Sequence, residues 1–160
     1  MSEVLAPCAG RVLPITECVD EVFAGQLVGP GLVIDPPDGS QTVVAPIAGT
    51  VMKIHPHAFV VVGEGTGVLV HLGINTVRLE GVGFEVHAAQ GSTVVAGDPM
   101  ITWDPASLPS EAAGQAISRQ VPVVVLDAPA DSLDLPSLPL EVTPGALLFA
   151  LPQGHAASSR

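Results

Sequence analysis

The amino-acid sequence predicts an all-β fold, an antiparallel sandwich or barrel with short helical turns. Val, Ile, Thr and Leu cluster in short runs, and 16 prolines and 17 glycines separate these runs at close intervals. Such runs with such breaks are typical of short strands joined by turns. Long stretches with the 3.6-residue period of a helix are few. Since 48% of the 160 residues are hydrophobic and 13% are charged, the chain can bury one sizeable core.

The expected strands follow the apolar runs along the chain. Their ranges are 2–5, 10–14, 32–36, 41–45, 49–55, 58–62, 67–72, 85–88, 99–103, 122–127, 141–143 and 146–151. Two helical segments are expected between them. Asp20 suits the N-cap of one turn over 20–23, and Pro105 suits the first turn of a helix over 104–113.

The remaining segments set the domain organisation. Residues 128–139 are rich in Pro, Asp and Ser and are expected to form a long surface loop. Residues 153–160 are small and polar, and we expect them to form a flexible C-terminal tail. The sequence therefore predicts a single domain over 1–152.

A short Ala-Pro-x-x-Gly motif occurs twice. Ala6-Pro7-Cys8-Ala9-Gly10 is repeated as Ala45-Pro46-Ile47-Ala48-Gly49, 39 residues later. Ala-Pro favours an extended entry, and the glycine permits a tight bend or a close backbone approach before the next strand. We interpret the repeat as two related β-units folded against each other.

Composition excludes several classes of partner. Sixteen acidic residues against five basic ones give a net charge of −11, so nucleic acid and anionic membrane surfaces are poor partners. A basic protein would instead be attracted. No apolar run is long enough to span a membrane and no signal peptide is apparent, so no direct membrane insertion and a cytoplasmic location are expected. Cys8 and Cys18 are expected to be buried, reduced thiols.

Two histidines stand out on the expected strands. Along residues 68–72 the side chains alternate, so Leu69 and His71 share one face. An imidazole in apolar surroundings is biased toward its neutral, nucleophilic form. If residues 57–62 and 67–72 form a hairpin, His57 and His71 meet at its open end.

A histidine pair permits three kinds of chemistry. The pair can bind zinc incidentally, which His55-x-His57 keeps open, although zinc usually needs a third protein ligand. It can perform general acid–base catalysis. It can also carry an anionic group on one imidazole while the other holds the anion. The residues by themselves leave these alternatives open.

Several segments together resemble one known family. Residues 67–104, GVLVHLGINTVRLEGVGFEVHAAQGSTVVAGDPMITWD, and residues 6–36, APCAGRVLPITECVDEVFAGQLVGPGLVIDP, are similar to the glucose-type enzyme IIA proteins of the bacterial sugar phosphotransferase system. The paired Ala-Pro-x-x-Gly segments and His57-Ala58-Phe59 agree with this resemblance. It is close over residues 3–127 and looser for the last strand.

The resemblance implies a fold, a reaction and partners. It implies an antiparallel β-sandwich that accepts a phosphoryl group on Nε2 of His71, with His57 as the second active-site histidine. The implied donor is the phosphocarrier HPr, and the implied acceptor is the cysteine of the IIB domain of a sugar permease. No cofactor is implied, and regulatory protein targets are a further possibility. The implied docking face comprises Asp20, Phe23, Leu27, Val28, Leu69, Val70 and Asn75.

The sequence departs from the family pattern near the site. Asn75 replaces a common Asp, and Arg78 replaces a common acidic residue, which makes the docking face less negative. His55-Pro56 stands where a Thr-containing approach to His57 is usual, so His55 is a candidate to orient His57 instead.

Two alternatives from other functional classes remain. One is a biotinyl- or lipoyl-like carrier, because Val51-Met52-Lys53-Ile54 resembles a modification site. That site needs its lysine at a hairpin tip, whereas Lys53 is expected inside a strand that begins after Gly49. The other alternative is a non-catalytic regulatory binding module that never carries phosphate.

Overall fold

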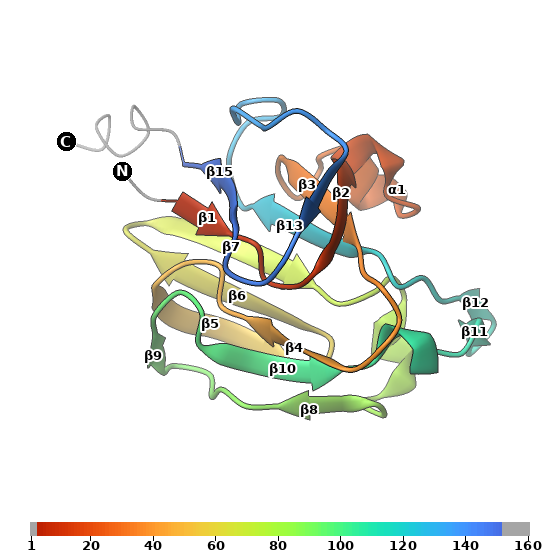
Figure 1. The fold of residues 1–160 in the computed structure, drawn as a ribbon. Helices are drawn as coiled ribbons and strands as arrows, with labels where there is room; N and C mark the ends of the chain where they lie inside the picture. Colours follow the sequence, from red (N-terminus) through yellow and green to blue (C-terminus); the bar gives the residue numbers. More distant parts are fainter. Residues whose placement is uncertain (1–2, 152–160) are drawn as a thin grey trace.

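The computed structural model describes residues 3–151 and shows an almost entirely β-structured chain, as the sequence predicts (Figure 1). The strands are β1 (Glu3–Leu5), β2 (Gly10–Pro14), β3 (Gly31–Asp35), β4 (Gln41–Val44), β5 (Gly49–His55), β6 (Ala58–Gly63), β7 (Thr66–His71), β8 (Phe84–Val86), β9 (Thr93–Val94), β10 (Pro99–Trp103), β11 (Glu111–Ala112), β12 (Gln115–Ala116), β13 (Val121–Val125), β14 (Leu140–Val142) and β15 (Leu147–Ala150). The helical elements are short: α1 (Glu21–Ala24) and the 3-10 helices η1 (Ile15–Glu17), η2 (Thr76–Leu79) and η3 (Pro105–Ser107).

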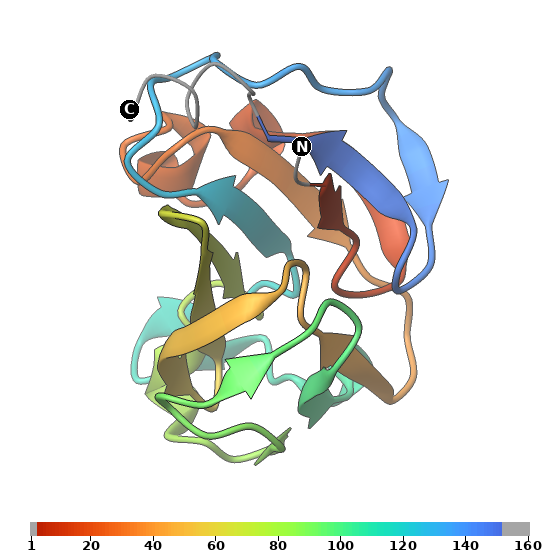
Figure 2. The same ribbon diagram turned by 90° about the vertical axis from the view of Figure 1, so that its left-hand side faces the viewer.

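Most strands belong to one eight-stranded antiparallel sheet, in the order β14-β2-β3-β13-β7-β6-β5-β9. A three-stranded sheet, β4-β10-β8, packs against it, and β1 pairs with β15. Figure 2 shows β2, β3 and β13 in the upper half of the molecule and β5, β8 and β10 in the lower half, so the large sheet runs through both halves. β7 lies near the middle of this sheet, between β13 and β6.

The main core lies between the sheets. It contains large, fully buried side chains from both of them, including Trp103, Phe59, Leu32, Met100 and Ile101. Burial of apolar surface on this scale is the main favourable term in folding.

A second, smaller apolar cluster covers the outer face of the large sheet. Phe23 of α1 packs there against Val33 of β3 and Val124 of β13, and Leu69 of β7 lies at its edge. Central strands such as β13 are therefore buried on both faces, which explains their unbroken apolar sequence. This second cluster holds α1 next to the end of β7.

The repeated motif has equivalent contacts in its two copies. The amide of Leu5 donates to the Pro46 carbonyl, and the amide of Val44, 39 residues after Leu5, donates to the Pro7 carbonyl. The glycines that open β2 and β5 both lie against backbone. A methyl group on Gly49 would come within 2.2 Å of the Val62 carbonyl oxygen, so no larger residue fits.

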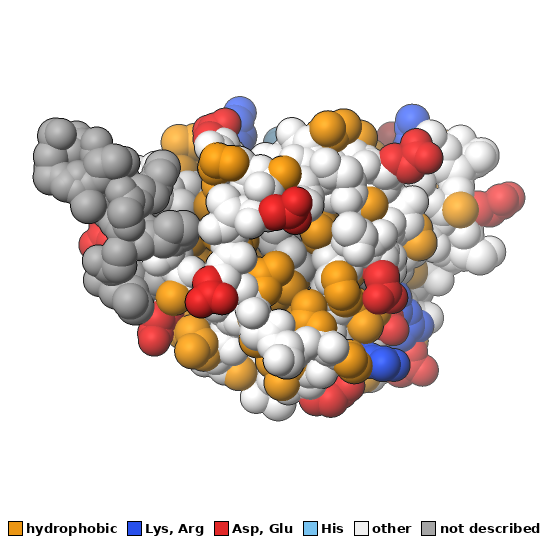
Figure 3. Space-filling model, turned by 90° about the horizontal axis from the view of Figure 1, so that it is seen from above, with side chains coloured by type: hydrophobic (Ala, Val, Ile, Leu, Met, Phe, Trp, Pro, Cys, Tyr) orange, Lys and Arg blue, Asp and Glu red, His pale blue; other side chains and the backbone are white. Residues whose placement is uncertain are grey.

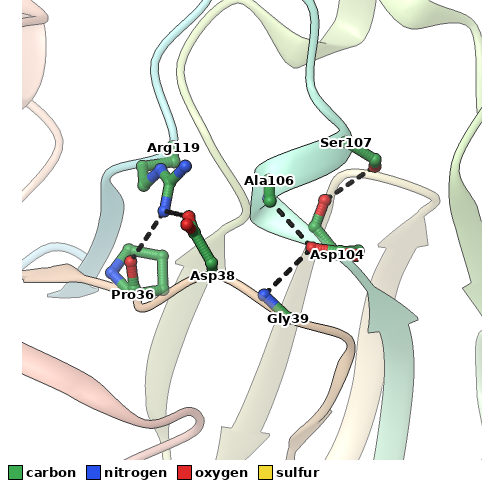
Figure 4. Close-up of polar contacts among 7 residues, drawn as sticks. All are labelled: Pro36, Asp38, Gly39, Asp104, Ala106, Ser107 and Arg119. Carbon is green, nitrogen blue, oxygen red and sulfur yellow. Dashed lines mark hydrogen bonds and ion pairs between the residues drawn. The ribbon is translucent and has the colours of Figure 1, made fainter.

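The crossover between the two sheets, from β3 to β4, is held by polar contacts (Figure 4). Arg119 donates to the Asp38 carboxylate (2.6 Å) and to the Pro36 carbonyl (3.3 Å). Asp104 accepts from the amide of Gly39 at 3.2 Å and also caps η3. Surface ion pairs of this kind add little free energy, so their effect is mainly to fix the path of the crossover.

Several expected elements are confirmed and one is wrong. The turn after Asp20 is helical, and the Asp20 carboxylate caps it by accepting from the Val22 amide. The expected helix over 104–113 ends after η3, because Pro109 cannot donate a helical hydrogen bond. The hairpin β11–β12 follows instead, with positive φ at Ala113 and Gly114, as a two-residue turn requires.

Other expectations concern the thiols, the loop and the tail. Cys8 and Cys18 are free and buried, as predicted, and desolvation raises the pKa of Cys8 to about 12. No strand or helix occurs between β13 and β14, as expected for residues 128–139. The predicted tail over 153–160 lies outside the described residues. No helix within residues 3–151 is long and apolar enough to cross a membrane.

Candidate functional site

His71 is the last residue of β7 and points to the outer face of the large sheet. The pleat places it on the same face as Leu69, as the alternation in the sequence predicts, while Val68 and Val70 are buried in the core. Its ring lies 5.5 Å from the ring of Phe23, centroid to centroid, at 59°. The apolar cluster under α1 thus forms one wall around the imidazole.

A backbone carbonyl fixes the tautomer of His71. Nδ1 lies 2.5 Å from the carbonyl oxygen of Gly73. A carbonyl can only accept, so Nδ1 carries the proton, and in the neutral ring the lone pair is on Nε2. The nucleophilic atom of His71 is therefore Nε2.

The turn after β7 keeps this carbonyl in place. Gly73 has φ +83°, and a methyl group there would lie 2.5 Å from Thr76 and 2.7 Å from the Ser118 carbonyl oxygen. Thr76 is fully buried and its hydroxyl donates to the Leu72 carbonyl at 2.7 Å. Only glycine combines this backbone conformation with this close packing.

His57 lies beside His71, as the sequence predicts. The hairpin β6–β7 turns through Glu64 and Gly65, both at positive φ, and pairs Ala58 with His71. The Leu72 amide donates to the His57 carbonyl at 2.7 Å, which closes the open end of the hairpin. The two imidazole centroids are 5.2 Å apart, with ring planes at 69°.

Both imidazoles favour the neutral form. Burial, together with the smaller effects of the neighbouring charges of His71 and His55, lowers the pKa of His57 from 6.5 to about 4. Burial also lowers the pKa of His71, although the hydrogen bond to Gly73 and the charge of Asp20 oppose that shift. At neutral pH the site therefore presents two uncharged imidazoles.

The low pKa of His57 predicts a pH-dependent stability. A histidine whose pKa is lower in the folded chain than in the unfolded one takes up protons on unfolding. Between pH 6.5 and about 4 the free energy of unfolding therefore falls as the pH falls. In His57→Gln this contribution is absent, so the variant should lose less stability on acidification. Urea unfolding at neutral pH and at about pH 4.5 measures the difference; equal losses in both proteins would contradict it.

The predicted docking residues are distributed unequally around the pair. Leu27 is 77% exposed, while Asp20, Val28, Leu69 and Asn75 are partly exposed. Phe23 is buried and contributes its contact with the His71 ring. The prediction is wrong for Val70, which is 0% exposed. It alternates with Leu69 and His71 along β7, so its side chain enters the core.

The structure adds a wall to the site that sequence reasoning missed. Ala116 at the end of β12 and the following residues Ile117 and Ser118 face the start of α1 across a groove of about 590 Å³. Asn75 anchors this wall, because its amide donates to the Ala116 carbonyl at 2.8 Å. No motif in the sequence marks residues 111–118, which come near the site only through the tertiary fold.

Two other expectations about side chains can be compared with the structure. Lys53 is exposed within β5, paired opposite Val60, and so does not occupy a hairpin tip. No group of three or more His, Cys, Asp or Glu side chains suited to a metal ion occurs in the described part of the chain. For zinc, the described residues thus offer the pair His57 and His71, one ligand fewer than catalytic zinc sites have.

The charge around the groove is mixed. Asp20 and Glu21 lie on its α1 side, and Arg78 of η2 hydrogen-bonds through Nε to Gln115 at 2.9 Å on the hairpin side. Figure 3, which views the molecule from above, shows acidic side chains scattered among apolar ones, with few basic side chains. The surface is thus suited to a partner with a basic, partly apolar face.

Comparison with known proteins identifies close relatives of this fold and sequence. The chain is 41% identical over 104 residues to the glucose-specific EIIA component of Bacillus cereus, a match that covers 63% of this chain and 62% of that protein. It thus spans less than two thirds of that relative's length. The glucose-specific EIIA component of Oceanobacillus iheyensis is 34% identical over 125 residues, covering 76% of this chain and 72% of that protein.

The chain is also similar to part of a longer protein and to a solved structure. The glucose-specific EIICBA component of Streptococcus pneumoniae is 38% identical over 144 residues, 88% of this chain but 18% of that protein. The solved structure of glucose permease IIA from Mycoplasma capricolum matches with a TM-score of 0.79 and 31% identity, covering 92% of this chain and 93% of that one.

A family model covers most of the chain. The model described as phosphoenolpyruvate-dependent sugar phosphotransferase system, EIIA 1, matches residues 2–130, which include β7, α1 and both imidazoles of the site. The chain therefore belongs to the EIIA 1 family of the phosphoenolpyruvate-dependent sugar phosphotransferase system.

Proposed function

We propose that this protein is a histidine phosphocarrier that takes a phosphoryl group from phospho-HPr onto Nε2 of His71 and passes it to the IIB cysteine of a sugar permease. The observation that carries the proposal is the hydrogen bond from Nδ1 of His71 to the Gly73 carbonyl. It leaves the lone pair on Nε2, in a ring that burial keeps neutral.

Each transfer is a displacement at phosphorus. The lone pair of Nε2 attacks the phosphorus atom of the donor's phosphohistidine; the new N–P bond forms as the donor's N–P bond breaks, and the bonding electrons return to the donor imidazole. In the second step a cysteine thiolate attacks the same phosphorus, and the electrons of the N–P bond return to Nε2 of His71. Such reactions depend on in-line positioning and charge stabilisation, and this route needs no cofactor.

His57 supplies charge stabilisation in this scheme. Its ring centroid is 5.2 Å from that of His71, so a phosphoryl group on Nε2 comes within reach of an imidazole N–H. In the resting protein both imidazoles are uncharged, so the two rings lie side by side without charge repulsion. The phosphoryl dianion raises the pKa of His57, because an adjacent negative charge favours the cation. Acceptance of the phosphoryl group is thus coupled to stronger hydrogen bonding from His57.

The surroundings of the pair suit transient protein partners. The apolar side chains of Val28 and Leu69 pack against the cluster that holds Phe23, whose ring contacts His71, and this apolar surface would help to exclude water from a labile N–P bond. Asp20 and Glu21 beside them attract a basic donor. A permease as acceptor is supported by relatives named EIICBA components, in which an EIIA segment is part of a longer protein. The free, buried thiols of Cys8 and Cys18 support a reducing, cytoplasmic location.

The proposed function is tested by phosphorylation with a defined donor. The protein is incubated with phosphoenolpyruvate, enzyme I and HPr, and its intact mass is measured with and without HPr. We expect a gain of one phosphoryl group that requires HPr, is lost in acid and persists in base. No gain in mass, or a gain that is stable in acid, would contradict a phosphohistidine intermediate.

The docking face yields a separate prediction. Leu27 is 77% exposed in the segment that follows α1, so Leu27→Asp should weaken the encounter with HPr without unfolding the protein. We expect KM for phospho-HPr to rise about tenfold, with little change in kcat. A rise of this size is typical of an interface residue whose replacement costs more than about 1 kcal/mol of binding free energy. The matched control is Leu147→Asp on β15, at a leucine that is 53% exposed. Equal effects of the two substitutions would refute a docking role for Leu27.

A further inference from the structure

A third imidazole continues the histidine pair. His55 is the last residue of β5, and its ring is stacked on that of His57, with centroids 5.8 Å apart and planes at 20°. His57 in turn meets His71 edge to face at 5.2 Å. The ring of His57 is therefore placed between two other imidazoles.

Ring contacts are what restrains the side chain of His57. His71 is oriented by its hydrogen bond to Gly73, and the distant His87 by one to the Thr102 hydroxyl at 2.7 Å. Within residues 3–151 no hydrogen bond to the side chain of His57 is found. A histidine that acts on a charged group is usually oriented by a hydrogen bond to its other nitrogen, and for His57 the stacked ring of His55 takes that place.

The backbone holds His55 in position for this contact. β5 and β6 are joined by the two-residue turn Pro56-His57, and His55 pairs opposite Ala58. Pro56 has a fixed φ, and its ring packs beside Gly81, where a methyl group would lie 3.3 Å from Pro56 Cγ. The strand pairing and the fixed φ of Pro56 thus restrict the turn, and the two stacked rings are carried on an ordered backbone.

Little else in the structure accounts for the placement of His55. Its side chain is exposed, so its burial contributes little to stability. Its charge does act on the site, since His55 is one of the groups that lower the pKa of His57. The charges that act on His57 are those of His55 on β5 and His71 on β7. The charge that acts on His71 is that of Asp20 at the start of α1.

We propose that His55 is a positioning residue for phosphotransfer: its ring, stacked on His57, holds the His57 imidazole in the orientation that serves a phosphoryl group on His71. This inference rests on the proposed function of His71 and His57. It assigns to His55 no contact with the phosphoryl group and no proton transfer, so an aromatic ring without nitrogen is sufficient at this position.

Two substitutions separate stacking from other roles of His55. His55→Ala removes the ring, and His55→Phe keeps a ring that can stack. The matched control is His87→Ala, which removes an exposed histidine that hydrogen-bonds to Thr102, on the smaller sheet. The first measurement is the single-turnover rate of phosphoryl transfer from the phosphorylated protein to the isolated IIB domain of a glucose-specific permease. The second is the NMR titration of the His57 ring in the unphosphorylated protein.

We expect His55→Ala to slow onward transfer about tenfold, since small misplacement of a catalytic group costs up to about a hundredfold. KM for phospho-HPr should not change. The rates of onward transfer in His55→Phe and His87→Ala should stay within about twofold of the rate of the parent protein, because neither substitution misplaces a catalytic group. In the NMR titration the pKa of His57 should rise above about 4 in His55→Ala. The substitution removes a ring that shields His57 from water, and it also removes a nearby like charge.

The inference fails if His55→Ala transfers phosphate at the parental rate, or if His55→Phe is as slow as His55→Ala. It also fails if the His57 titration is unchanged in His55→Ala. These failures can be distinguished from failure of the proposed function. If the parent protein never accepts phosphate, the phosphocarrier proposal is wrong, while the NMR titration still reports whether His55 controls the environment of His57.

Discussion

Replacement of His71 by alanine is expected to abolish phosphorylation by phospho-HPr completely. Nε2 of His71 carries the lone pair that attacks phosphorus, and alanine offers no nucleophile in its place. His57 lies close by, but it has no backbone carbonyl that fixes its tautomer in the way Gly73 does for His71. The gain of one phosphoryl group in the intact mass should therefore disappear in His71→Ala.

The control for this experiment must show that the variant is folded. His71 is partly exposed at the end of β7, so its truncation should leave the fold intact, which circular dichroism and a thermal melt can check. His87→Ala removes a histidine outside the site and should be phosphorylated normally. A folded His71→Ala protein that still gains a phosphoryl group would show that another residue is the acceptor.

Replacement of His57 by glutamine is expected to separate acceptance from delivery. The glutamine amide can donate an N–H to the phosphoryl oxygens, so His57→Gln should still become phosphorylated. It cannot become a cation as the imidazole does beside a dianion, and it therefore stabilises the transferring group less. We expect transfer to the IIB domain to slow by about 10²–10³-fold, the usual cost of losing one such donor.

The measurement is a pair of single-turnover experiments on the same protein. Phosphorylation by phospho-HPr is followed first, and the purified phosphoprotein is then mixed with the IIB domain. His57→Asn is a useful companion, because its shorter amide should reach the phosphoryl group less well and should not exceed His57→Gln in either step. If His57→Gln fails to accept phosphate at all, His57 has a role in the first transfer that this scheme does not include.

The local features of the site could be read from the sequence because they depend on neighbouring residues. Strand alternation places Leu69 and His71 on one face, and the turn at Glu64 and Gly65 brings His57 to the end of β7. Asp20 three residues before Phe23 marks the start of α1. Each of these relations spans fewer than about twenty residues and follows from backbone geometry.

The features that could not be read join segments far apart in the chain. The Gly73 carbonyl is fixed by close packing against Ser118, and the wall at Ile117 reaches the groove only when β13 pairs with β7. The error at Val70 has a different origin: the same alternation that places Leu69 and His71 on one face turns Val70 toward the core, and resemblance to a docking segment does not take that alternation into account.

The β-class, the repeated motif, the acidic charge and the family resemblance follow from the sequence, because composition, period-two alternation and turn residues are properties of short segments. The folded chain is needed to show which nitrogen of His71 is free, how the three imidazoles stack, and which side chains around them remain exposed. These depend on ångström-scale distances between side chains and backbone atoms, which residue spacing alone does not give. The turn at Gly73, for example, is held by close packing against Thr76 and the distant Ser118, and no local pattern encodes that packing.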